Sequence, residues 1–161
     1  MAISCVLALM LASAAGSQAA LAESGPFADL QGRWSGTGTI REEGASTERI
    51  RCSADYRPLG TTGHEIDLGL RCNSDSYNFD LSGQFRADAS NQIAGNWTER
   101  SRGVGGTVIG NARGNRLQIH VESSAFAATL YMVTRGRQQS VSIDSHGGGQ
   151  VVKASITLHR H

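Results

Sequence analysis

Proline, aromatic residues and net charge are all scarce in this sequence. Only two prolines occur among 161 residues, Pro26 and Pro58, and neither interrupts a run of alternating apolar and polar residues. The formal net charge is +1, so the basic surplus that a nucleic-acid or anionic-membrane partner demands is missing. Two tryptophans, three tyrosines and four phenylalanines are too few for the aromatic girdles of an outer-membrane barrel.

No Lys or Arg precedes the apolar run from Cys5 to Ala15, yet residues 1–22 otherwise have the features of a secretory signal. The run is too short to span a bilayer, and small residues follow it, ending in the triplet Ala-Leu-Ala at 20–22. We reject a lipoprotein signal, because a lipid-attached cysteine follows the apolar run and Cys5 begins it. We therefore predict cleavage after the triplet, a single mature domain over 23–161 with no membrane span, and a periplasmic or secreted location.

Cysteine is equally sparse, and removal of residues 1–22 leaves only Cys52 and Cys72. An even pair in an exported chain predicts a disulfide. The closed loop of about 20 residues stabilises the fold by about 3 kcal/mol in the chain-entropy model. Neither cysteine has a histidine or a second cysteine at metal-ligand spacing, so we expect no metal site.

After position 30 apolar and polar residues alternate, and no stretch keeps the 3.6-residue period of a helix. Turn signals separate about ten such runs, and Gly114-Asn115 is a two-residue hairpin turn. In each run one phase is apolar and the other polar, as in an antiparallel sheet with one face on a core. We predict an all-β domain, an antiparallel up-and-down meander of about eight to ten strands that forms a barrel. A β-sandwich is the alternative, because alternation does not distinguish the two.

The cysteine pair also sets a register for the first long hairpin. With Cys52 opposite Cys72, apolar residues meet and opposite charges meet in three further pairs: Ala54 with Leu70, Tyr56 with Leu68 and Arg57 with Asp67. An apolar-x-Gly-x-large motif recurs at 30–34, 81–85 and 93–97, and its inward glycines leave room for a neighbouring ring. For the hairpin with two copies we predict two pairs: Gly83 with Gly95 and Leu81 with Trp97.

Residues 30–38 read Leu-x-Gly-x-Trp-x-Gly-x-Gly and resemble the first strand of calycin-type barrels, in particular the nitrobindin-like haem barrels. The resemblance implies a calycin-like barrel. Haem binding in that family needs an axial histidine at the start of the last strand. Here that place holds Val151 and Val152, while His159 and His161 lie at the far end of the chain, so we expect no haem and no other cofactor.

A broader resemblance covers nearly the whole mature chain. The matching segments are Trp34–Gly38, Glu48–Cys52, Leu70–Phe79, Gly95–Glu99 and Thr134–Ile143. They are similar to those of a group of small exported alphaproteobacterial proteins. The resemblance implies a β-rich fold and an exported location, and it adds no chemistry.

Aromatic residues of the inward phase form the candidate site. They line a pocket for a small hydrophobic ligand in one interpretation and an ordinary core in the other: Trp34, Tyr56, Tyr77, Phe79, Phe85 and Trp97. Glu99 follows Trp97 in the same phase and either orients a ligand at the barrel mouth or reaches water where the alternation ends. We favour the second role, because buried unpaired carboxylates are rare.

The sequence does not determine the function. It has no Gly-x-Ser-x-Gly elbow and its five histidines are scattered, so we expect no catalytic residues and no enzyme. Our best hypothesis is a periplasmic or secreted barrel that binds a small hydrophobic ligand. The alternative is a structural or protein-interaction module with a solid core, which contacts another exported protein through a sheet edge or loops.

Overall fold

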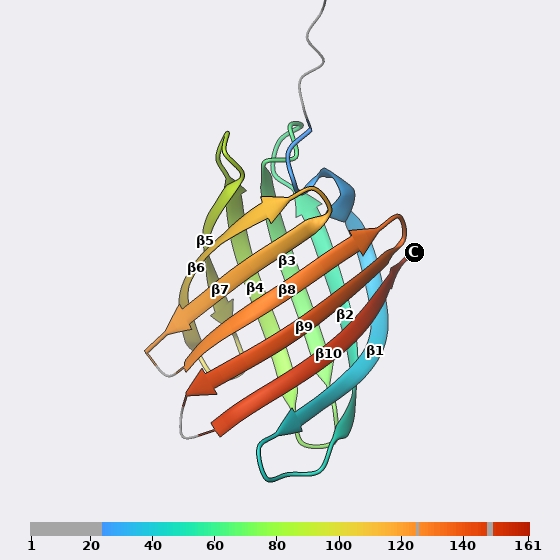
Figure 1. Cartoon of the computed structure of the whole chain (residues 1–161), viewed down its shortest axis with the longest axis vertical. Coiled ribbons are helices and arrows are strands. Elements are labelled where there is room, and N and C mark those ends of the chain that lie inside the picture. The colour runs from blue at the N-terminus through green and yellow to red at the C-terminus, as the bar shows by residue number, and fades with distance from the viewer. Residues whose placement is uncertain (1–23, 125, 148–149) are drawn as a thin grey trace, which may run out of the picture.

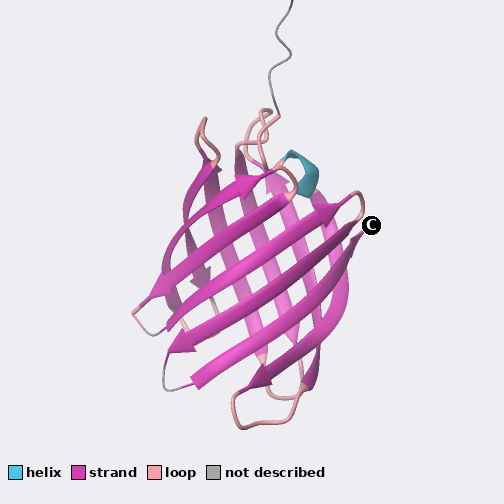
Figure 2. Cartoon of the chain, in the orientation of Figure 1, coloured by secondary structure: helices cyan, strands magenta, loops and turns pink. Residues whose placement is uncertain are grey.

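The computed structural model describes residues 24–124, 126–147 and 150–161, so the expected leader 1–22 lies outside the described residues. Within these ranges ten strands follow one another (Figure 1): β1 Gly32–Glu42, β2 Glu48–Pro58, β3 Glu65–Asn73, β4 Asn78–Ala87, β5 Gln92–Glu99, β6 Val104–Arg113, β7 Arg116–Ser123, β8 Phe126–Arg135, β9 Gln138–Gly147 and β10 Gln150–Arg160. One short 3-10 helix, η1 (Ala28–Leu30), lies at one end of the strands (Figure 2). The described part of the chain contains no helix that is long and apolar enough to cross a membrane.

The sheet is a closed barrel, because its first and last strands pair with each other. Each strand pairs antiparallel with its neighbour in sequence, and β1 pairs with β10 so that Gly38 lies opposite Ile156. Among the described strands, closure leaves no free edge with unpaired backbone groups. The predicted all-β up-and-down barrel is therefore confirmed, and the β-sandwich is excluded.

Alternation along the strands decides which side chains face the interior. Successive side chains of a strand point to opposite faces, and the ladders connect the apolar phases of neighbouring strands. One such row runs from Trp34 on β1 through Ala54 on β2 to Leu70 on β3. The apolar phase thus stays on the inside around the barrel, and the polar phase faces solvent.

The predicted register of the β2–β3 hairpin is confirmed. Cys52 pairs with Cys72, and the two are joined by a disulfide. On the outer face Arg57 lies opposite Asp67, and its Nε donates to Asp67 Oδ2 at 2.9 Å. The covalent link and the hydrophobic pattern therefore specify the same pairing.

The predicted register of the β4–β5 hairpin is wrong by two residues. Gly95 pairs with Phe85 and not with Gly83. The turn is wider than predicted, because Asp88 Oδ1 accepts a hydrogen bond of 2.9 Å from the backbone N–H of Gln92 and holds the turn together. A slip of two residues keeps each side chain on its face, so the predicted inward set is unchanged.

A short N-terminal segment, residues 25–31, covers one end of the barrel, and we call it the plug. The backbone N–H of Phe27 donates to the carbonyl of Gly63 at 3.0 Å, which ties the plug to the β2–β3 loop. Glycine is required at position 25, because a Cβ at Gly25 would lie 2.4 Å from the backbone of Gly63. Phe27 and Leu30 are buried and pack on the barrel core, so the plug closes this end.

Arg160, at the end of β10, connects the last strand to the plug. Its guanidinium donates to the carbonyls of Asp29 and Gln31, each at 3.3 Å, and lies 5.2 Å from the centroid of the Trp34 ring. The indole of Trp34 in turn donates to the carbonyl of Leu30 at 2.7 Å. Both ends of the described chain therefore meet at the plugged end.

Replacement of both cysteines, as Cys52→Ala with Cys72→Ala, is expected to lower the free energy of unfolding by about 3 kcal/mol. The unfolded chain then regains the entropy of a loop that spans 20 residues. Urea denaturation of the oxidised protein, the reduced protein and the double variant measures the effect. If the oxidised and reduced proteins unfold at the same urea concentration, the disulfide does not stabilise the fold.

Candidate ligand-binding site

The inside of the barrel is packed at the plugged end. Most inward side chains of this half are buried, with Leu68 and Phe85 partly exposed; the buried ones include Trp34, Tyr56, Ile66, Ile93, Leu117, Met132 and Leu158. A gap between the plug and the β6–β7 turn has a volume of about 20 Å³, which is room for a single water molecule. This half of the barrel is therefore an ordinary solid core.

Toward the opposite end, solvent reaches the inward side chains. The partly exposed residues are Leu70, Phe79, Leu81, Ile119, Val121, Leu130, Ile143, Val152 and Ala154. They occupy the same phase of the strands as the buried set, so we attribute their exposure to the interior side of the wall. Ile40 and Ile50 remain buried where β1 and β2 approach their hairpin.

We call this accessible region the cup. Its wall comes from β3 and β4 and from β7 to β10, and its open end lies among the loops at 43–47, 74–77 and 100–103. The wall consists mainly of aliphatic side chains. Such a surface matches an apolar ligand and offers little to a charged one.

Inward glycines make room for aromatic rings in the wall, as the repeated motif predicts. A Cβ at Gly83 would lie 2.5 Å from Cζ of Phe85, and a Cβ at Gly95 would lie 2.7 Å from its Cδ1. The ring of Phe85 therefore covers both glycines. Across the next ladder, a Cβ at Gly106 would lie 3.1 Å from Nε1 of Trp97, so this indole also packs on a glycine.

Tyr77 and Phe79 lie at the open end of the cup. Their rings stack with centroids 6.1 Å apart and planes 4° from parallel. Tyr77 donates its hydroxyl to Glu42 Oε2 at 2.7 Å, and this hydrogen bond, followed by burial, raises the pKa of Tyr77. The guanidinium of Arg102 lies 5.2 Å from the centroid of the Phe79 ring. Polar groups therefore stand at the mouth, beside an aliphatic interior.

Glu99 holds the β5–β6 loop. Its carboxylate accepts hydrogen bonds from the backbone N–H groups of Asp80 at 3.0 Å, Ser101 at 3.2 Å and Arg102 at 2.8 Å. Burial raises the pKa of Glu99, but the hydrogen bonds, led by that from the Ser101 hydroxyl, outweigh it and lower the pKa to about 2. Glu99 is only 5 % exposed, so the expectation that it reaches water is wrong. The loop folds back over it and satisfies its oxygens.

Trp34 and Tyr56 lie in the packed half and not in the cup. Their rings meet edge to face with centroids 6.5 Å apart. The Tyr56 hydroxyl donates to Gln139 Oε1 at 3.0 Å, and Gln139 Nε2 donates to Thr134 Oγ1 at 3.2 Å. Burial raises the pKa of Tyr56. The buried pair Gln139 and Thr134 was not predicted, although each is a polar residue in the inward phase of its strand.

Trp97 lies between the two halves and is 3 % exposed. Its indole N–H donates to the carbonyl of Glu122 at 3.4 Å. Of the predicted binding residues, the structure therefore brings Tyr77 and Phe79 to the cup. Trp34, Tyr56, Trp97 and Glu99 lie in packed surroundings.

A separate hollow of about 490 Å³ lies on the outside of the barrel over β4, β5 and β6. Its lining mixes the charged residues Glu65 and Arg86 with the apolar residues Leu59 and Ile109 and with amide side chains. Most of its lining residues face outward, although Phe85, Gly95 and Val108 belong to the inward phase, and we assign it no part in the cup.

Metal ligands do not converge anywhere in the described ranges. Across residues 24–124, 126–147 and 150–161, no three His, Cys, Asp or Glu side chains are placed to hold a metal ion. His159 is exposed on β10, and His161 Nε2 lies 2.5 Å from Ser35 Oγ. The lack of a cofactor and of enzymatic activity remains a prediction.

No family model and no curated protein matches this sequence. Among solved structures, the S-type phycobiliprotein lyase CPES from Guillardia theta is similar, with a TM-score of 0.66 and 9 % identity over 84 % of this chain and 90 % of that chain. Rv2717c from M. tuberculosis is similar with a TM-score of 0.68 and 14 % identity, over 83 % of this chain and 94 % of that chain. These similarities support the calycin-like barrel fold.

The lowered pKa of Glu99 predicts that stability depends on pH. Because its folded pKa of about 2 lies below the ordinary value of 4.5, the folded protein binds fewer protons between these values than the unfolded chain. The stabilisation by Glu99 is therefore complete above about pH 5 and is lost as the pH falls toward about 2. At neutral pH, Glu99→Gln is expected to cost about 2 kcal/mol, because hydrogen bonds to a charged acceptor are lost.

Urea denaturation of the wild type and Glu99→Gln between neutral and acid pH measures the difference in unfolding free energy. This difference should shrink on acidification. The exposed Glu43, as Glu43→Gln, is the matched control and should behave like the wild type. A difference that does not change with pH would show that the charge of Glu99 is not the stabilising feature.

Proposed function

We propose that this protein is a binding barrel for a small hydrophobic ligand, held in the cup. One observation carries the proposal: inward aliphatic side chains are buried beneath the plug and partly exposed toward the other end. When a ligand covers an apolar wall that is in contact with water, the removal of apolar surface from water lowers the free energy and favours binding. The site needs no catalytic group.

The wall and the mouth indicate how such a ligand lies. Leu130, Ile143 and Val121 offer only apolar contact, so the apolar part of the ligand enters the cup. The hydroxyl of Tyr77 and the guanidinium of Arg102 stand at the mouth, where a polar end of the ligand can be hydrated or hydrogen-bonded. We therefore propose an aliphatic ligand whose polar group points outward.

The alternative, an interaction module with a solid core, predicts buried inward side chains along the whole barrel. Partial exposure of the cup residues favours the binding barrel instead. Closure between β1 and β10 also removes the free sheet edge through which such a module was expected to pair. The barrel fold that this chain shares with the phycobiliprotein lyase CPES is compatible with the proposal.

We further propose that residues 1–22 are removed on export and that residues 23–161 act in the periplasm or outside the cell. The disulfide between Cys52 and Cys72 supports this, because disulfides persist in oxidising compartments. The ligand is then one that occurs in that compartment.

Filling the cup should weaken binding. Leu130→Trp places an indole on the inner face of β8, and it is expected to weaken uptake of the uncharged dye N-phenyl-1-naphthylamine by about tenfold or more, because the dye and the ring compete for the same volume. Tyr131→Trp is the matched control, since it places the same ring on the outer face one residue away. Dye fluorescence measures affinity, and the melting temperature verifies folding. Equal dye affinity in both variants would refute binding in the cup.

The two halves of the barrel should respond differently to substitution. Phe79→Ala removes an aromatic wall of the cup mouth and is expected to lower dye affinity with a small loss of stability. Tyr56→Phe leaves Gln139 Oε1 without its donor, so it is expected to cost about 1–2 kcal/mol of stability and to leave affinity unchanged. Dye titration and urea denaturation of both variants measure this. A Tyr56→Phe protein with weakened dye binding would place the ligand in the packed half.

A further inference from the structure

Three arginines gather on the outer face of β6, β7 and β8 at the plugged end. Arg113 pairs with Arg116 across the β6–β7 turn, Arg116 pairs with Val133, and Arg135 is the next outward residue of β8. All three arginines are exposed. None has a hydrogen-bond or ion-pair partner among the described residues.

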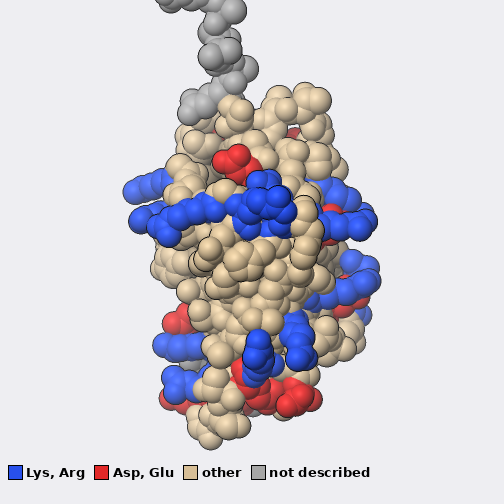
Figure 3. Space-filling view, turned by 90° about the vertical axis from the view of Figure 1, so that its right-hand side faces the viewer, with Lys and Arg blue, Asp and Glu red and all other residues tan. Residues whose placement is uncertain are grey.

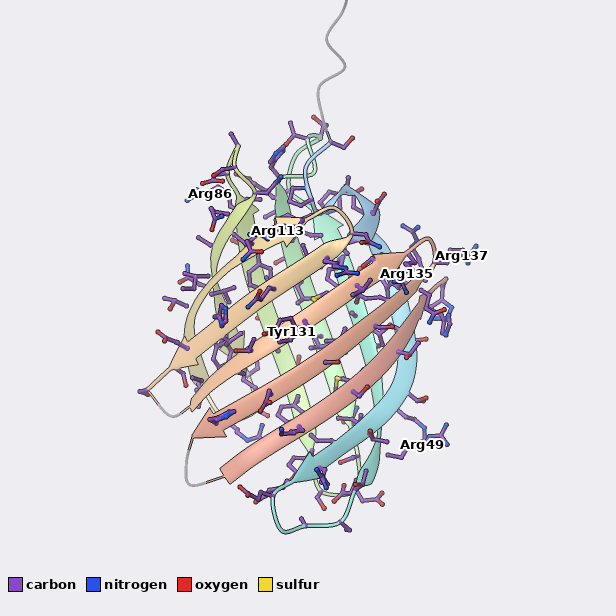
Figure 4. All side chains as sticks on the ribbon, in the orientation of Figure 1. Arg49, Arg86, Arg113, Tyr131, Arg135 and Arg137 are labelled. Atoms are coloured by element: carbon purple, nitrogen blue, oxygen red, sulfur yellow. A yellow bond between two sulfur atoms is a disulfide. The ribbon has the colours of Figure 1, made fainter. Side chains whose placement is uncertain are left out.

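Two exposed apolar side chains lie farther along the same strands, each separated from the nearest arginine of its strand by one outward residue, Asn111 on β6 and Val133 on β8. Tyr131 is 52 % exposed and Ile109 is 61 % exposed, on the outer faces of β8 and β6. Tyr131 shares the outward phase of β8 with Val133 and Arg135. Figure 4 shows Arg113 and Arg135 toward the plugged end and Tyr131 farther down the same side of the barrel. We call Arg113, Arg116, Arg135, Tyr131 and Ile109 the β6–β8 patch.

The charge of the patch is not balanced nearby. In the outward phase of β6–β8, within the described residues, the one acidic residue is Glu122, toward the other end of β7. At that other end several basic residues do have acidic partners, such as Arg71 with Asp80 at 3.6 Å and Lys153 with Asp144 at 3.4 Å. Figure 3, which views another side, likewise shows a band of basic side chains nearer the plugged end.

The low net charge therefore conceals an uneven distribution. The formal net charge of +1 averages over the whole chain, and it argued against an anionic partner only on that basis. A local cluster of unpaired arginines generates a positive potential whatever the total. The low net charge of the chain therefore does not exclude an anionic partner at this face.

From this arrangement we infer that the β6–β8 patch docks the barrel on the surface of an anionic phospholipid bilayer. Arginine forks match lipid phosphates, and each basic residue near an anionic surface adds to the affinity. Tyrosine and isoleucine beside the arginines suit the boundary between headgroups and acyl chains. The patch lies on the convex wall of a barrel, to which fluid lipids adapt more readily than a rigid partner. This inference does not depend on ligand binding in the cup.

Co-sedimentation of residues 23–161 with vesicles tests the inference. Vesicles of phosphatidylcholine are compared with vesicles that contain about 30 % phosphatidylglycerol, at low salt and at about 0.5 M NaCl. The patch variant combines Arg113→Gln, Arg116→Gln and Arg135→Gln. The control variant combines Arg41→Gln, Arg49→Gln and Arg51→Gln, three exposed arginines on β1 and β2 whose loss changes the net charge equally. Tyr131→Trp adds a fluorescent reporter, because the native Trp34 and Trp97 are buried.

We expect binding that requires phosphatidylglycerol, decreases at high salt and falls about 100-fold in the patch variant. The control variant should lose much less, and emission from Tyr131→Trp should shift to the blue on binding. Equal losses in the two variants would overturn the inference, because net charge alone would explain them. Equal binding to both kinds of vesicle, or binding to a soluble polyanion such as dextran sulfate without binding to vesicles, would overturn it as well.

Discussion

The pairing of β1 with β10 is the constraint on which the rest of the structure depends. It joins the two ends of the sheet from Trp34 opposite Arg160 to Glu42 opposite Val152. Once this seam is made, each strand has two fixed neighbours, and a slip of one residue in any ladder would turn apolar side chains toward water. A single inward phase must therefore hold around the whole barrel. The core, the cup and the outer patch are three consequences of that one requirement.

Much of this wall could be predicted from the sequence, because period-two alternation is a local signal. The cysteines at 52 and 72 added a long-range restraint, and the register they imply for β2 and β3 is the observed one. The β4–β5 hairpin had no such restraint. Alternation determines which side chains of a strand point inward, but it is compatible with registers that differ by two residues. The turn at Asp88 selects the observed register.

The division of the interior into a core and a cup could not be predicted in the same way. It depends on the plug, whose residues 25–31 have no periodic pattern and are placed by hydrogen bonds to a distant loop. For this reason the depth of each inward aromatic residue in the barrel could not be predicted, and Tyr56 and Phe79 were both expected at the binding site. Glu99 was misjudged on similar grounds, because its hydrogen-bond partners come from Asp80 on β4 and from a loop that folds back over it. The β6–β8 patch could not be predicted either, because its residues come together only when β6, β7 and β8 pair side by side.

The seam also decides when the fold can be completed. Hairpins such as β6–β7 need only residues close in sequence, whereas β1 must wait for β10, and Arg160 completes the contacts with Asp29 and Gln31. Contacts so far apart in sequence form slowly, because a long loop must close first. A chain that emerges from its N-terminus, whether from a ribosome or a translocation pore, can pair β1 with β2 early but keeps the other edge of β1 unpaired until β10 appears. The barrel therefore closes only after its last strand has been made.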